Sequence, residues 1–147
     1  DLETEYGLKY ASFKRVLAES DFLSIHVPLT PQTNHFIGEK QLKMMKPSSI
    51  LVNLSRGPVV DTEALQQALT KGTIAGAGLD VFDPEPVPTD HPILGLDNVV
   101  VLPHIGSASN RSRRDMHLLA ARNLVAGLNG DRLEECANPD VYESLGI

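Results

Sequence analysis

The chain has 147 residues, of which 41% are hydrophobic and 22% charged, and 19 acidic against 13 basic side chains give a net charge of −6. An acidic chain of ordinary composition argues against binding to nucleic acid or to anionic membranes, because both partners favour basic patches. Cys136 is the single cysteine, which excludes an internal disulfide and a zinc site built from several cysteines.

The first residues, Asp1 to Glu5, lack the basic-then-apolar order of a signal peptide, and no apolar run approaches the ~20 residues of a membrane helix. We therefore expect a cytoplasmic protein. Because the sequence begins at Asp1 without an initiator methionine, we also expect it to be a fragment of a longer protein.

Residues 1–11 are polar and ambiguous, and the pattern favours the end of a helix followed by a short edge strand at Leu8–Tyr10. From Ser12 onward, strand and helix patterns alternate. The predicted elements are, in chain order, a helix capped by Ser12 and running to about Glu19, a strand at Phe22–His26, a short helix at Glu39–Met45, a strand at Ile50–Leu54, a helix capped by Asp61 and running to about Lys71, a strand at Thr73–Val81, a strand at Val99–Leu102, and a long helix from Ser107 or Ser109 to about Leu128.

This alternation is typical of an α/β fold with a doubly wound parallel sheet. The runs Ile50–Val52 and Val99–Leu102 are continuously apolar, which predicts strands buried on both faces. In such a sheet, ligands bind beyond the carboxyl ends of the strands.

Four chemically capable side chains follow the predicted strands: Arg56, Asp80, Glu85 and His104. The planar fork of Arg56 suits a substrate carboxylate, and His104 can exchange a proton with an oxygen on the adjacent carbon. Glu85 lies between two prolines that stiffen its loop, and it is expected to hydrogen-bond the imidazole and favour its protonated form. The set therefore resembles a site that reduces a 2-keto acid with hydride from a nicotinamide.

Each of these residues also has an ordinary structural interpretation. Arg56 fits a surface arginine, Glu85 a solvated loop carboxylate, and Asp80 the cap of a turn. His104 fits a core histidine satisfied by the backbone. His26 could cover the sheet edge or contact a cofactor.

The other charged and titratable residues carry less information. The remaining histidines show no metal-ligand spacing and are interpreted as surface or packing residues: His35, His91 and His117. A group of arginines fits a solvated helix face, with phosphate contact as the alternative: Arg111, Arg113 and Arg114. No metal site is predicted.

Three motifs in order resemble the D-isomer-specific 2-hydroxyacid dehydrogenase family. They are the arginine signature at Asn53–Gly57 with Val60-Asp61, the glutamate signature from Gly78 to Pro86, and the histidine signature at Leu102–Ser107. The resemblance runs from about Ser12 to Gly130. Within the family, the stretch Leu102–Gly130 and the loop from Pro84 to Pro92 most resemble the glyoxylate/hydroxypyruvate reductase branch.

The resemblance implies that Arg56 anchors the substrate carboxylate, that His104 is the acid/base and that Glu85 is its partner. It also implies contacts to NADPH or NADH from a set of residues at the strand ends: Val27, Pro28, Thr33, Leu54, Ser55, Asp80, Gly106 and Ser107. The whole protein would be a homodimer that acts on a small 2-keto acid.

The glycine-rich phosphate loop of the family, and the strand that selects NAD or NADP, do not occur in this sequence. We therefore expect residues 1–106 to be the C-terminal part of a Rossmann-type cofactor domain. Residues 107–147 would be a long helix and tail that return to a missing substrate domain. The fragment alone is expected to be inactive, and an NAD(H)-sensing transcriptional co-repressor of the same fold remains the alternative function.

Overall fold

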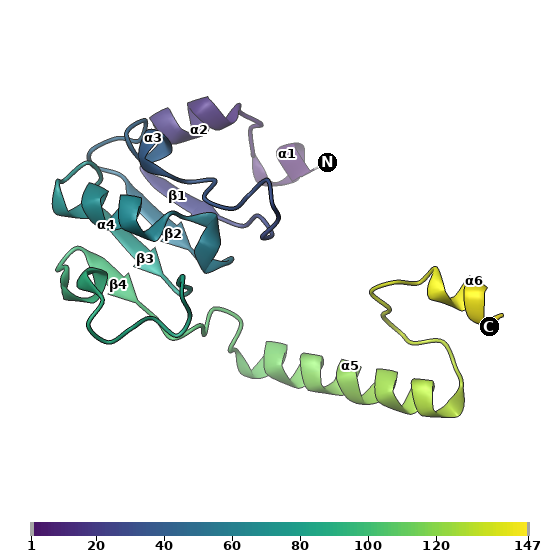
Figure 1. Ribbon diagram of the computed structural model, residues 1–147. Helices are drawn as coiled ribbons and strands as arrows, with labels where there is room; N and C mark the ends of the chain where they lie inside the picture. Colours follow the sequence, from purple (N-terminus) through teal and green to yellow (C-terminus); the bar gives the residue numbers. More distant parts are fainter. Residues whose placement is uncertain (1, 147) are drawn as a thin grey trace. The chain divides into compact units, whose positions relative to one another are not determined.

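The computed structural model describes residues 2–146, which divide into two compact units, the first ending at Ile105 and the second beginning at Gly106. The first unit is built on a parallel sheet of four strands, β1 (Phe22–Ile25), β2 (Ile50–Asn53), β3 (Gly76–Leu79) and β4 (Val99–Val101). The strands are hydrogen-bonded in chain order, β1-β2-β3-β4 (Figure 1). The predicted α/β class with a parallel sheet is confirmed.

The register of the sheet brings the carboxyl ends of the strands level with one another. Ile25 pairs with Asn53, Asn53 pairs with Leu79, and Leu79 pairs with Val101. The loops that follow the four strands therefore leave from one edge, which is where a parallel sheet collects its functional groups.

Short helices begin and end close to the predicted places. In the first unit they are α1 (Leu2–Tyr6), α2 (Phe13–Glu19), α3 (Glu39–Leu42) and α4 (Thr62–Thr70), with 3-10 turns η1 (Gly57–Val59) and η2 (Pro92–Gly95). Asp61 caps α4 by accepting a hydrogen bond from the Ala64 amide at 3.0 Å, and Ser12 caps α2 in the same way.

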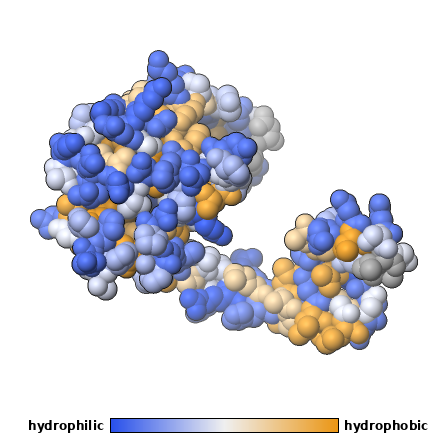
Figure 2. Space-filling view, in the orientation of Figure 1, coloured by the Kyte–Doolittle hydropathy of each residue, from blue (hydrophilic) through white to orange (hydrophobic). Residues whose placement is uncertain are grey.

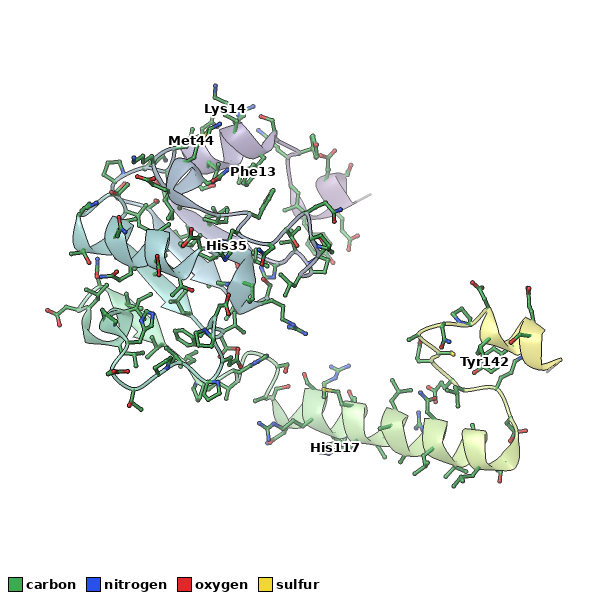
Figure 3. All side chains as sticks on the ribbon, in the orientation of Figure 1. Phe13, Lys14, His35, Met44, His117 and Tyr142 are labelled. Atoms are coloured by element: carbon green, nitrogen blue, oxygen red, sulfur yellow. The ribbon has the colours of Figure 1, made fainter. Side chains whose placement is uncertain are left out.

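The core of the first unit lies between the sheet and these helices. Leu17 of α2, Leu42 of α3 and Leu65 of α4 are at most 1% exposed and belong to one hydrophobic cluster with Leu51 of β2. A hollow of about 370 Å³ beside α2 and α3 is lined by residues that include Phe13, Lys14 and Met44, which Figure 3 labels. Burial of these leucines removes apolar surface from water and is the main stabilising contribution to the unit.

Two sequence predictions about the sheet are wrong. No strand forms at Leu8–Tyr10, where Tyr10 is 90% exposed and no apolar burial stabilises an extended edge. The strands are also not buried on both faces. In β2, buried residues alternate with half-buried ones, and Val100 of β4 is 65% exposed. The helices of the first unit cover one face of the sheet, and β4 is an edge strand. The apolar sequence of β4 therefore does not mean that the strand is buried on both faces.

The second unit contains α5 (Asn110–Asn129) and α6 (Val141–Leu145). Ser109 caps α5 by accepting from the Ser112 amide at 3.1 Å, and Gly130 ends the helix with a left-handed φ of +80°, which favours glycine. Apolar side chains gather on the surface of this unit (Figure 2). Leu124 and Leu128 of α5 are among the exposed hydrophobic residues. Between residues 2 and 146, no helix has the length and apolar character needed to cross a bilayer.

Candidate active site

The loop after β2 is held by the amide side chain of Asn53, which is 1% exposed. Its Oδ1 accepts from both the amide and the hydroxyl of Ser55, at 3.1 and 3.0 Å, and its Nδ2 donates to the Arg56 carbonyl at 3.0 Å. Arg56 itself is exposed, and its guanidinium donates to the Ser55 carbonyl at 2.7 Å. The loop therefore presents the exposed guanidinium of Arg56 on a backbone that the buried side chain of Asn53 holds in place.

Gly57 brings this loop against the one that carries Glu85. A Cβ placed on Gly57 would lie 1.7 Å from the Phe82 carbonyl oxygen and 2.0 Å from its carbon. The Thr62 hydroxyl also lies 3.5 Å from the Asp83 carbonyl oxygen. Only a residue without a side chain permits this approach, so Gly57 sets the separation between the arginine loop and the glutamate loop.

His104 and Glu85 form an ion pair or hydrogen bond between the loops after β3 and β4. The imidazole Nδ1 lies 2.6 Å from Glu85 Oε1, and Oε2 of the same carboxylate accepts weakly from the Phe82 amide at 3.4 Å. The side chains of His104 and Glu85 are 47% and 38% exposed. Because Glu85 engages Nδ1, Nε2 is the ring nitrogen that can exchange a proton with a ligand.

The backbone at His104 adopts a left-handed conformation, with φ of +55°. This conformation is uncommon for a residue with a side chain and persists only where the surroundings impose it. The next amide, that of Ile105, donates to Oδ1 of the buried Asp80 at 2.7 Å. The interpretation of His104 as a core histidine satisfied by the backbone is wrong, since its ring is exposed and bound by Glu85.

Two hollows open at this edge of the sheet. One of about 510 Å³ is lined by residues after β1 and β2, His26, Val27, Pro28, Leu29, Leu54, Ser55 and Arg56. The other, of about 320 Å³, includes Asp80, Glu85 and His104 with the apolar Phe82, Leu94 and Val101. Except for Thr33, the residues of the first unit that were predicted to touch substrate or cofactor therefore line these two hollows.

Thr33 lines neither hollow but is hydrogen-bonded to Pro28, which lines the first one. Its hydroxyl donates to the Pro28 carbonyl at 2.6 Å and lies 2.7 Å from the Thr30 amide, which donates to it. It thus closes the turn that begins at Pro28. Gly106 and Ser107 belong to the second unit, and their predicted contact with a cofactor stays a prediction.

The remaining titratable residues make contacts of their own, although His26 also lines the first hollow and His91 lies in the loop after β3. His26 pairs with the Ser24 hydroxyl at 2.8 Å, and the His91 imidazole caps η2. His35 follows β1 and His117 lies on α5 (Figure 3). Arg111 and Arg114 both pair with Asp115 along α5. Among residues 2–146, no group of three His, Cys, Asp or Glu side chains is placed to hold a metal.

The comparison with protein families identifies the chain. Residues 1–106 match the model described as D-isomer specific 2-hydroxyacid dehydrogenase, NAD binding domain. The chain belongs to this family. It is 54% identical over 143 residues to glyoxylate/hydroxypyruvate reductase B of Pectobacterium carotovorum subsp. carotovorum (strain PC1), covering 97% of this chain and 45% of the relative.

Other members of the family agree with this result. Glyoxylate reductase of Thermococcus litoralis is 52% identical over 144 residues, covering 98% of this chain and 43% of the relative. The NAD-complexed D-isomer specific 2-hydroxyacid dehydrogenase of Lactobacillus delbrueckii ssp. bulgaricus superposes with a TM-score of 0.82 at 39% identity, over 91% of this chain and 45% of that one. The chain thus spans less than half the length of the relatives it matches, and its sheet is of the Rossmann type found in this family.

Sequence reasoning did not predict the structural roles of two residues that shape the site, Asn53 and Gly57. Asn53 directly follows the apolar run Ile50–Val52, and an asparagine at the end of such a run was the available signal, but its burial was not. Gly57 follows the arginine directly, but its neighbour across the fold, the Phe82 carbonyl, is far away in sequence.

Proposed function

We propose that the whole protein reduces a small 2-keto acid, glyoxylate or hydroxypyruvate, to the D-2-hydroxy acid, using NADPH or NADH. The observation that carries the proposal is the His104–Glu85 pair, at 2.6 Å, beside a loop that presents Arg56. A proton donor and a carboxylate anchor are the two groups that this reduction requires of the protein. The names of the relatives favour these substrates over other keto acids.

The residues of the first hollow fit a flat cofactor ring. Val27, Pro28 and Leu54 offer apolar surface, and Ser55 adds a polar group beside them. Such a wall, mostly apolar with few polar groups, is typical of a site for a planar ligand. When bound there, the nicotinamide would supply the hydride. Residues 1–106 are proposed as part of the cofactor domain.

The protein's own residues would then orient the keto acid and deliver a proton. Arg56 would hold the substrate carboxylate through two parallel hydrogen bonds, which fixes the keto carbon in position. His104 would donate from Nε2 to the keto oxygen as negative charge develops on that oxygen. Glu85 would hold the ring through Nδ1 so that Nε2 stays directed at the substrate.

The whole protein is further proposed to be a cytoplasmic homodimer, in which residues 107–147 lead back to a substrate domain. These statements rest on the resemblance to the family. Size determination by light scattering of the full-length gene product tests the dimer, and a monomeric mass for the active protein contradicts it.

A direct assay tests the proposed activity. The full-length gene product is expected to oxidise NADPH or NADH in the presence of glyoxylate or hydroxypyruvate, and to release the D-isomer of glycerate from hydroxypyruvate. Loss of nicotinamide absorbance measures the rate, and chiral chromatography identifies the product. A folded protein that turns over neither acid with either cofactor contradicts the proposal and leaves the co-repressor as the remaining function.

The Arg56→Ala variant is expected to raise the KM for the keto acid by roughly 10²-fold and to change kcat much less, because it removes charge-assisted hydrogen bonds made before and during the reaction. Arg56→Lys keeps the charge but loses the planar fork, so we expect an intermediate KM. Steady-state kinetics at saturating cofactor measures both constants. An unchanged KM in the alanine variant shows that another group anchors the carboxylate.

A further inference from the structure

Three polar residues of the described chain are almost completely removed from solvent: Ser49, Asn53 and Asp80, at 0%, 1% and 1% exposure. Burying a polar group is unfavourable unless it is hydrogen-bonded, so each such residue identifies a place where the fold requires a specific hydrogen bond. Ser49 precedes β2 and donates to the nearby Lys46 carbonyl at 2.7 Å. Asn53 and Asp80 lie at the other end of the sheet, directly under the proposed site.

Asn53 connects the ends of two strands. Its side chain holds the Ser55 amide and hydroxyl and the Arg56 carbonyl, as described above. Its backbone carbonyl accepts from the Asp80 amide at 3.0 Å. One buried residue therefore fixes both the arginine loop and the first residue after β3.

Asp80 continues the connection to the third strand end. Its Oδ1 accepts from the Ile105 amide at 2.7 Å, and Ile105 directly follows His104. A hydrogen bond to a carboxylate is stronger than one between neutral groups. This bond is well placed to hold the left-handed backbone at His104, where φ is +55°.

We propose that Asn53 and Asp80 are positioning residues that together form a buried brace between Arg56 and His104. The brace is the hydrogen-bonded path from the Arg56 carbonyl through Asn53 to Asp80 and on to the Ile105 amide. It sets the distance between the carboxylate anchor and the proton donor, which must match the short span from the carboxylate to the keto oxygen of the substrate. The inference rests on the proposed function, which assigns those two roles.

The kinetic test uses Asn53→Leu in the full-length gene product, since leucine has nearly the same shape and makes no hydrogen bond. The KM for the keto acid is expected to rise by about tenfold or more, with kcat changed less, because the loop that carries Arg56 loses its support. Ser49→Ala is the matched control: it removes an equally buried hydrogen bond at the opposite end of β2. We expect it to lower stability while leaving the KM unchanged.

A second variant covers the case in which Asn53→Leu fails to fold. Asn53→Asp keeps the shape and an acceptor for Ser55, but it places a carboxylate oxygen against the Arg56 carbonyl in place of the N–H donor. The KM is expected to rise here too. A KM equal to that of the parent in a folded Asn53 variant overturns the proposal, as does an equal rise in Ser49→Ala.

Amide hydrogen exchange tests the brace without any turnover. We expect exchange at Ser55 to accelerate by about tenfold in Asn53→Leu, and exchange at Ile105 to accelerate similarly in Asp80→Ala, each at its own position. If both rates stay at the parent values, the brace does not exist. If the parent protein turns over no keto acid while exchange changes as expected, the brace stands and the proposed function fails, so the two failures are distinguishable.

Discussion

Replacing His104 by alanine is expected to lower kcat by roughly 10²–10⁴-fold, the usual contribution of a positioned general acid, with a much smaller change in the KM for the keto acid. The expectation follows from geometry. The imidazole is exposed at the edge of a hollow, and Glu85 holds Nδ1 at 2.6 Å, so Nε2 is the nitrogen available to a substrate. Steady-state kinetics with hydroxypyruvate measures both constants.

Two further variants separate this role from a structural one. Glu85→Gln keeps an oxygen that can accept from Nδ1 but replaces a charge-assisted hydrogen bond by a weaker neutral one, so the ring is held less firmly and the loss in kcat should be smaller than in His104→Ala. His117→Ala removes an exposed histidine on α5 and should leave both constants unchanged. A His104→Ala enzyme with the parent's kcat shows that the proton comes from another group or from water.

Much of the first unit could be predicted from local pattern alone. The four strands and the capped helices at Ser12 and Asp61 are encoded in short stretches of sequence, and the structure confirms them within a few residues. The apolar run of β4 was misleading because an edge strand and a central strand can share the same composition. Burial depends on what packs against a strand, and that partner is distant in sequence.

The candidate site, too, was predictable from local sequence only in part. Sequence indicated which side chains follow the strand ends, because a parallel sheet brings those ends together whatever the loops contain. It did not indicate that Gly57 meets the Phe82 carbonyl, or that Asn53 and Asp80 share a hydrogen-bonded path. Those contacts join residues more than twenty positions apart, and only the register of β2 with β3 brings them together.

Among alanine substitutions at the described glycines of the first unit, Gly57→Ala is expected to lower stability the most. The added Cβ would meet the Phe82 carbonyl at 1.7 Å, and backbone atoms cannot rotate away as the end of a side chain can. The arginine loop and the glutamate loop must then separate, at a cost of about 3 kcal/mol or more in the free energy of unfolding. Thermal and denaturant unfolding of the full-length gene product measure this loss.

Gly95→Ala is the matched control for that result, because Gly95 also lies in a 3-10 turn and a Cβ there meets nothing within 4 Å. It should unfold at nearly the parent temperature. Any Gly57→Ala protein that remains folded should also have a raised KM and a lowered kcat together, because the loops it separates carry Arg56 on one side and Glu85 on the other. A stable variant with the parent's kinetics shows that the two loops do not depend on their close approach.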